Sequence, residues 1–243
     1  MNTSIPNYVV HMAASCLISH DGPHPNRKMT LPTTGILFAS GKRRCVVGAA
    51  AKRFATDGLA ITAVSGINHK DGSERKDLTH SFSVELASVD MVRTYEYEEQ
   101  KWALLGVQIH EGEQPGRAGT DGCFVPAKPT PLPAASVFTP PMQSLATGTK
   151  LRVAGIRAKG SVAETVVVSA VLAKTYRQGV VVVLPKSGID GVEFGGAPIF
   201  SGNNHLVAIG LFVGRLKSGD AALVGLSPQE LVSCAGHMID GIM

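Results

Sequence analysis

Two nucleophilic residues in this sequence have neighbours that suggest covalent catalysis. Ser201 precedes His205 by four positions, and a hydroxyl beside an imidazole is the pairing that acyl transfer uses. Closeness along the chain does not orient such a dyad, and Gly202-Asn203-Asn204 is typical of a hairpin turn that a serine caps. Cys123, in GTDGCFVP, follows a glycine-rich turn and is the second candidate nucleophile. We interpret Ser201 as a turn cap and keep Cys123 as a minor alternative.

Metal and phosphate chemistry have no recognisable motif here. The 8 histidines form neither an H-x-x-x-H nor an H-E-x-x-H pair, and the 4 cysteines lie far apart without a C-x-x-C. No G-x-x-x-x-G-K-[ST] loop is present to bind a phosphate. We therefore expect no cofactor and no metal site, and four reduced thiols in an intracellular protein.

A glycine-rich turn in the last third of the chain is the most informative stretch. GVEFGGAPIF, residues 191–200, runs from glycines into the apolar pair Ile199-Phe200, and a second turn follows. Gly195 lies at the tip of the first turn. Glycine has no side chain, so Gly195 itself offers no nucleophile.

Short strands must position this turn. Runs rich in Val, Ile, Leu or Thr, each bounded by Gly, Asp, Asn or Ser, predict strands along most of the chain. Helix patterns are few, which favours an all-β barrel or sandwich. The predicted strands are 34–38, 44–47, 59–64, 81–86, 102–109, 150–156, 165–172, 179–184 and 206–213.

Composition divides the chain into segments. Residues 126–141 hold six of the 14 prolines and predict an extended connector, because proline cannot donate to a central ladder. A long surface loop within one domain is the alternative. Ser227-Pro228-Gln229-Glu230 is a capping box that predicts a C-terminal α-helix. The expected organisation is an N-terminal extension, a first barrel, the connector, and a second barrel with the helix: 1–30, 31–125, 126–141 and 142–243.

Four stretches, in order, resemble trypsin-like serine proteases of the chymotrypsin fold. Residues 33–54 resemble the segment that ends in A-A-H-C, and residues 100–109 resemble the strand N-D-I-A-L-L. Residues 147–160 resemble the strand that opens the second barrel, and residues 191–215 resemble the nucleophile turn with its following strand. Among these proteases, the ordered set of stretches is most similar to intracellular and high-temperature-requirement-type members. The resemblance implies two antiparallel six-stranded-type β-barrels closed by the C-terminal helix. A different all-β fold is the alternative.

The same resemblance implies that the catalytic triad is lost. Ala51 stands where the family has its histidine, Lys101 where it has its aspartate, and Gly195 where it has its serine. The turn before the nucleophile is also altered. Glu193 occupies the place of an oxyanion-hole glycine, and Phe194 replaces the aspartate that pairs with a new N-terminus in secreted members.

The net charge and the N-terminal residues bear on the partners and the cellular compartment. The formal net charge is +4, with short basic clusters such as Lys42-Arg43-Arg44, so an RNA surface is a weaker alternative to a solvated face. No apolar run reaches the ~18 residues of a membrane span. The first 20 residues lack a basic region before their apolar part, so they do not predict a secretory signal. We expect an intracellular protein, cytoplasmic or mitochondrial.

Three functions are consistent with these residues. The first is a catalytically inactive trypsin-like pseudoprotease that serves as a structural or protein-binding subunit of a larger assembly. Its candidate peptide-pairing edge is Leu211-Phe212-Val213, and its first 30 residues are a candidate plug or anchor. The second is a divergent serine or cysteine peptidase that uses other residues. The third is an RNA-binding component of a ribonucleoprotein such as a ribosome.

Overall fold

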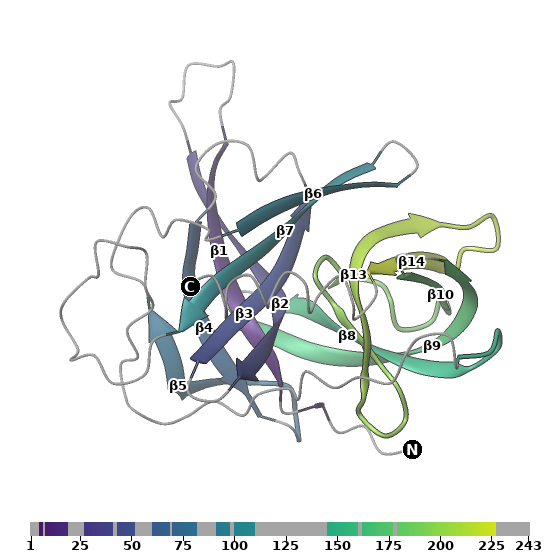
Figure 1. Ribbon diagram of the computed structural model, residues 1–243, viewed down its shortest axis with the longest axis horizontal. Coiled ribbons are helices and arrows are strands. Elements are labelled where there is room, and N and C mark those ends of the chain that lie inside the picture. The colour runs from purple at the N-terminus through teal and green to yellow at the C-terminus, as the bar shows by residue number, and fades with distance from the viewer. Residues whose placement is uncertain are drawn as a thin grey trace.

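Fourteen β-strands and no helix make up the described part of the chain in this computed structural model (Figure 1). The strands divide between two sheets of seven. The structure describes residues 5–6, 8–18, 27–40, 43–51, 60–68, 70–81, 91–97, 100–109, 145–159, 162–176 and 179–226.

The first sheet contains the strands from the N-terminal half. All of its pairings are antiparallel, and the strand order is β5-β4-β1-β2-β3-β7-β6. Its strands are β1 (Val9–Ile18), β2 (Arg27–Ser40), β3 (Arg43–Ala51), β4 (Ala60–Ile67), β5 (Glu74–Ser81), β6 (Met91–Tyr97) and β7 (Gln100–Ile109).

Strand β2 is covered on both of its faces. Successive side chains of a strand point to opposite faces, yet the neighbours Ile36 and Leu37 are both fully buried. This explains why the sequence has a continuous apolar run here rather than an alternation.

The second sheet closes into a barrel. Strands β8, β12, β13, β14, β10 and β9 form a ring because β8 also pairs with β9, and β11 adds to β8. Closure gives each of those six strands a partner on both sides over part of its length. The strands are β8 (Lys150–Lys159), β9 (Val162–Tyr176), β10 (Gly179–Leu184), β11 (Val192–Glu193), β12 (Pro198–Phe200), β13 (Leu206–Arg215) and β14 (Ala221–Leu226).

The barrel core is filled by side chains from every strand of the ring. In β10 the residues Val180, Val182 and Leu184 are fully buried, whereas Val181 and Val183 are half-buried. The run VVVVL is therefore a barrel strand with one face in the core and the other partly covered. Phe194 is also in this core cluster.

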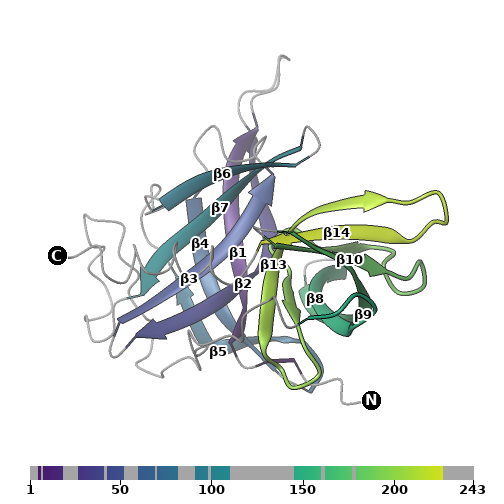
Figure 2. The ribbon, with the colours of Figure 1, turned by 45° about the vertical axis from the view of Figure 1, so that its right-hand side comes forward.

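The two sheets contact each other through strands that contain the protease-like stretches of the sequence. Strand β13 contacts β3 and β7, and β8 and β12 contact β2. Both ribbon views place β13 beside the first sheet (Figure 2). Side chains of the N-terminal region cross this junction: the Tyr8 hydroxyl donates to the carbonyl of Asn204, and His11 Nε2 lies 2.5 Å from Thr165 Oγ1.

The predicted all-β double-barrel architecture is confirmed, with one difference at the N-terminus. Strand β1 lies between β2 and β4, inside the first sheet, whereas we expected residues 1–30 to be an extension outside it. His11 interrupts the apolar pattern of β1 and hid the strand, but the histidine is buried against Thr165. The predicted connector, 126–141, and the predicted C-terminal helix from Ser227 lie outside the described residues.

Candidate functional site

The glycine-rich turn is built onto strand β13 by backbone hydrogen bonds. The Gly196 N–H donates to the Gly210 carbonyl at 2.8 Å, and the Gly210 N–H donates back to the Ala197 carbonyl at 2.7 Å. Gly196 has a φ of 76°, a left-handed conformation that favours glycine. The φ of Gly195 is not positive, so the backbone at Gly195 itself does not require glycine. The backbone conformation therefore favours glycine at position 196 but not at position 195.

One side-chain bond ties this turn to the first sheet. The hydroxyl of Thr33, on β2, donates to the carbonyl oxygen of Gly195 at 2.7 Å. Thr33 is half-buried. The tip of the turn is therefore held at the junction between the two sheets.

The positions of Ala51 and Lys101 are set by the ladder of β3 and β7. Ala51 faces Trp102 across this ladder, so Lys101 adjoins the residue opposite Ala51. On the β2–β3 ladder, Gly35 faces Gly48. Because the strands are antiparallel, Thr33 and Ala51 both lie beyond that pair at the same end. The backbone thus places Ala51 and Lys101 at neighbouring ends of β3 and β7, on the side of the Gly35–Gly48 pair where Thr33 of β2 bonds to Gly195.

Glu193 and Phe194 lie on opposite sides of the chain just before the turn. Glu193 is exposed and faces Ile156 in the short β11–β8 ladder. Phe194 is only 3% exposed and packs in the barrel core. An aromatic ring occupies an apolar site here, and a carboxylate in its place would require a compensating charge.

The candidate peptide-pairing edge lies on β13, beyond the end of β12. Residues 206–209 of β13 pair with β12, and residues 209–215 pair with β14 with a register shift between Gly210 and Phe212. Leu211 is buried. On the edge that faces β12, no strand among the described residues pairs with Leu211-Phe212-Val213. This segment therefore has the backbone arrangement that strand addition requires.

Ser201 and His205 do not form a dyad. The Ser201 hydroxyl accepts a bond of 3.3 Å from the backbone N–H of His205, and the Ser201 N–H donates to the His205 carbonyl. The turn between them is fixed by Arg152, whose Nη2 contacts the Ser201 and Gly202 carbonyls and Asn204 Oδ1. Ser201 is thus a turn cap, as expected. Cys123 lies outside the described residues.

Tyr8 fastens the start of the chain to this same turn. Its hydroxyl donates to the carbonyl of Asn204 at 2.7 Å, and the side chain is buried. Burial raises the pKa of the Tyr8 phenol well above its usual value, and the nearby Arg152 charge opposes part of that rise. The neutral phenol is therefore the form that the fold stabilises.

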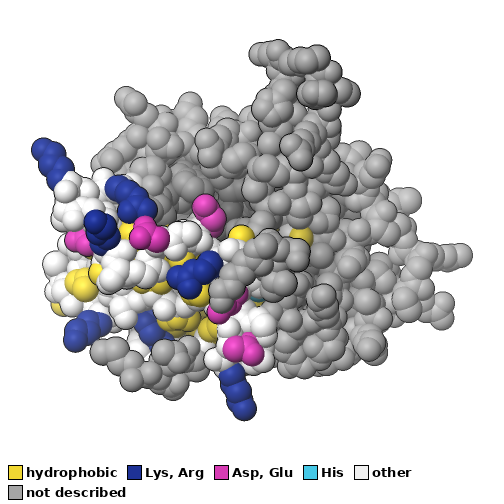
Figure 3. Space-filling model, turned by 180° about the vertical axis from the view of Figure 1, so that it is seen from behind, with side chains coloured by type: hydrophobic (Ala, Val, Ile, Leu, Met, Phe, Trp, Pro, Cys, Tyr) yellow, Lys and Arg dark blue, Asp and Glu magenta, His cyan; other side chains and the backbone are white. Residues whose placement is uncertain are grey.

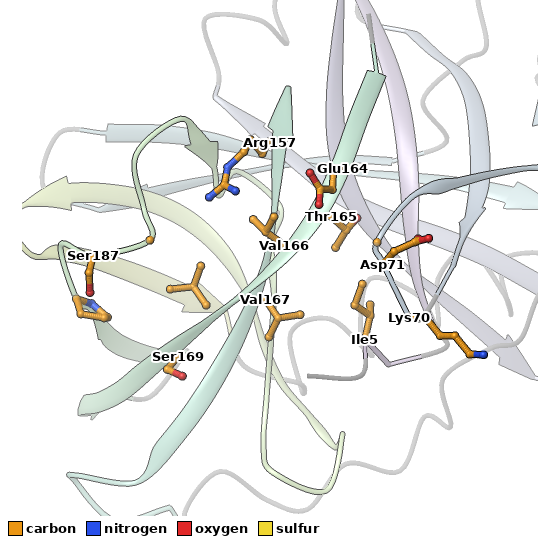
Figure 4. A pocket seen from close by; sticks show the side chains of 14 residues that line it. Ile5, Lys70, Asp71, Arg157, Glu164, Thr165, Val166, Val167, Ser169 and Ser187 are labelled. Carbon is orange, nitrogen blue, oxygen red and sulfur yellow. The ribbon is translucent and has the colours of Figure 1, made fainter. Parts of the chain in front are cut away.

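A groove that the sequence did not reveal runs along strand β9 (Figure 4). Its volume is about 620 Å³, and neither Ala51, Lys101 nor Gly195 lines it. Its walls come from β9, from the turn at 70–72 and from the chain after β10. The lining residues are Ile5, Lys70, Asp71, Gly72, Arg157, Glu164, Thr165, Val166, Val167, Val168, Ser169, Pro185, Ser187 and Gly188.

The described ranges bring no three His, Cys, Asp or Glu side chains together in a group that could hold a metal ion. Within those same ranges, no helix has the length and apolar character needed to cross a bilayer.

Solved structures that resemble this chain include two peptidases and an inactivated protease paralogue. The inactivated protease paralogue S-I1 of the scabies mite is 13% identical, with a TM-score of 0.55, and the match covers 96% of this chain and 95% of that one. Kallikrein-related peptidase 10 is 12% identical, with a TM-score of 0.51, and the match covers 97% of both chains. A Glu endopeptidase is 10% identical, with a TM-score of 0.51 and coverage of 96% and 92%. At these identities the likeness establishes the fold alone, the double β-barrel of the chymotrypsin type.

Sequence comparison adds no closer relative. No protein-family model matches the chain, and no curated protein matches it.

Proposed function

We propose that this chain is a catalytically inactive homologue of trypsin-like proteases, a pseudoprotease that serves as a structural or protein-binding subunit of a larger intracellular assembly. One observation carries the proposal. Ala51 and Lys101 lie at neighbouring ends of β3 and β7, Gly195 bonds to Thr33 on the adjacent β2, and none of these three positions has the side chain that the triad uses there.

The loss of chemistry follows from the residue types. A serine becomes a nucleophile when a neighbouring base takes its proton, and the base is held in the right tautomer by a carboxylate. Ala51 accepts no proton, and Gly195 has no side chain with which to attack. Lys101 would repel a protonated base rather than stabilise it. Glu193 would further disfavour a developing oxyanion at the turn.

The retained framework supports a binding role. The turn keeps its left-handed Gly196 and its bonds to Gly210, and the barrel around it has a dense apolar core. Most random substitutions destabilise a fold by about 1 kcal/mol, so a chain without any role would have lost this coherence. The open edge at Leu211-Phe212-Val213 is the proposed surface for an extended protein segment.

The domain organisation is part of the same proposal. We assign a first barrel that begins with β1 instead of near residue 31, a connector at 126–141, and a second barrel with a C-terminal helix at 142–243. We place the protein inside the cell, in the cytoplasm or the mitochondrion.

The test combines an active-site probe with native purification. The purified full chain is incubated with a fluorophosphonate probe and with broad peptide libraries, and we expect neither labelling nor cleavage. Tagged protein from its own cells, under gentle lysis and low salt, is expected in a complex with other proteins. Cleavage that disappears on mutation of a residue in this chain would establish a divergent peptidase instead. RNA recovery with an affinity that falls steeply with salt would favour the ribonucleoprotein alternative.

A further inference from the structure

Strand β9 has an edge that the barrel leaves partly uncovered. Residues 162–171 of β9 pair with β8 on one edge. On the other edge, β10 pairs with β9 only from Val171 to Tyr176. At the opposite end of the gap, the Thr165 N–H donates to the Gly72 carbonyl at 2.9 Å. Between these contacts, from Val166 to Ala170, no described strand covers this edge.

Hydrogen-bond directions show which backbone groups face the gap. The Leu172 N–H donates to the Thr149 carbonyl, on the β8 side, whereas the Thr165 N–H points to the other edge. Backbone groups alternate between the two edges of an antiparallel strand. Val167 and Ser169 therefore present their N–H and C=O groups on the Thr165 side, toward the groove (Figure 4).

The sequence after β10 explains why the edge is open. If the pairing of Val183 with Val171 continued, Pro185 would face Ser169 and Ser187 would face Val167. Proline has no N–H to donate to Ser169 at that position. The chain leaves the ladder at Pro185, and Pro185, Ser187 and Gly188 become a wall of the groove.

The charges around the groove favour an acidic occupant. The carboxylate of Asp71 is occupied by its own turn, because it accepts from the Ser73 N–H, the Ser73 hydroxyl and Asn68 Nδ2. Glu164 is half-buried and already interacts within the chain. Both carboxylates keep their negative charge, but cations outnumber them: Lys70 and Arg157 line the groove, and Lys186 adjoins its wall. Lys70 and Lys186 are exposed, and neither has an ion pair within the described residues. Figure 3 shows Lys and Arg side chains spread over the described barrel, with Asp, Glu and apolar side chains between them.

We propose that this groove binds an extended acidic peptide segment of a partner protein, which adds as a strand to β9. Its backbone pairs with the N–H and C=O groups of Val167 and Ser169, and its acidic side chains approach Lys70 and Lys186. The half-buried Val166 and Val167 supply apolar contact. This site is separate from the Leu211–Val213 edge and does not depend on whether the chain is catalytically inactive.

Fluorescence anisotropy of the full-length protein tests the site with defined probes. The probe is a fluorescein-labelled octapeptide of alternating valine and aspartate, and the comparison peptide has lysine in place of aspartate. We expect the acidic peptide to bind and the basic peptide to bind at least tenfold more weakly. A third peptide carries N-methyl groups on alternate backbone nitrogens in either register, and at least one register is expected to lose binding because the ladder bonds are removed.

Variants of the protein locate the site. Lys70→Gln is expected to weaken binding of the acidic peptide about two- to fivefold, as for a partly exposed ion pair. Lys217→Gln removes the same charge from an exposed hairpin outside the groove and is expected to leave binding unchanged. Val167→Pro removes a donor on the open edge and is expected to weaken binding at least tenfold.

Three results would overturn the proposal. The first is that neither N-methylated register changes the affinity, which remains informative even if Val167→Pro does not fold. The second is equal or tighter binding of the basic peptide. The third is that no peptide binds to the folded protein. None of these results involves peptidase activity, so they leave the proposed inactivity to its own test.

Discussion

The hydroxyl of Thr33 donates a 2.7 Å hydrogen bond to the carbonyl oxygen of Gly195, and this bond joins the first sheet to the glycine-rich turn of the second barrel. Thr33→Val keeps the shape of the side chain and removes the donor. We expect the free energy of unfolding to fall by about 1 kcal/mol, because the carbonyl of a half-buried turn is left without this partner. Urea denaturation measures the change. Thr33→Ser, which retains the hydroxyl, is the control and should lose less; equal losses would mean that the bond contributes nothing.

Restoring single catalytic residues is expected to fail. Gly195→Ser should fold, because the φ of Gly195 is not positive, but the new hydroxyl has no base beside it. Ala51→His alone has no nucleophile to activate. The triple variant with Lys101→Asp is expected to stay poor because Glu193 remains at the oxyanion turn. Fluorophosphonate labelling and peptide cleavage measure each variant. Activity from Gly195→Ser alone would contradict the assignment of Ala51 as the position of the base.

The fold was more predictable than the surfaces. Apolar runs such as VVVVL identified β10 at its observed bounds, because barrel strands bury apolar side chains on at least one face. Strands β5 and β6 were missed or misplaced; they are the two edges of the first sheet, and edge strands often carry charged and polar residues, as ERKDLTHS does. Strand β1 was missed because a buried histidine interrupts its pattern.

The candidate site also has one part that the sequence predicts and one part that it does not. The position of the turn could be predicted because Gly196 needs a left-handed conformation, which glycine supplies and which leaves a trace in the sequence. The groove on β9 could not, since it depends on the β9–β10 ladder ending before Pro185 would face Ser169, and only the folded barrel defines that register. Proline at position 185 is a local signal, but Ser169, which it would face, is sixteen residues away along the chain.

Gly72 lies at the contact between the first sheet and β9, and its substitution should lower the free energy of unfolding. Gly72 has a φ of 76°, and a Cβ atom there would come within 2.0 Å of the Thr165 carbonyl oxygen. We expect Gly72→Ala to lower the free energy of unfolding by roughly 3 kcal/mol or more, from left-handed strain and a backbone clash together. Gly191→Ala is the matched control, because its φ is 70° and nothing lies within 4 Å of the added methyl. Gly191→Ala should lower the free energy of unfolding by about 1–2 kcal/mol. Equal losses in denaturant titrations would show that the contact between Gly72 and Thr165 is not tight in solution.

Tyr8 makes the free energy of unfolding depend on pH in the alkaline range. Burial raises the pKa of its phenol above the unfolded value of about 10, so the folded state favours the neutral form. The stabilisation is complete below pH 10 and is lost as the pH rises from there toward the higher pKa of the folded state. Tyr8→Phe keeps the ring, loses the bond to the Asn204 carbonyl, and should cost about 1 kcal/mol at neutral pH. Above pH 10 the wild-type protein should lose stability more steeply than the variant, so that the two curves of unfolding free energy against pH converge. Tyr176→Phe, which removes a hydroxyl bonded to the Gly225 carbonyl inside the second barrel, controls for the loss of a tyrosine hydroxyl as such. Curves for wild type and Tyr8→Phe that stay parallel through this range would show that Tyr8 ionises as readily in the folded chain as in the unfolded one. The phenol would then not be buried against the second barrel in solution.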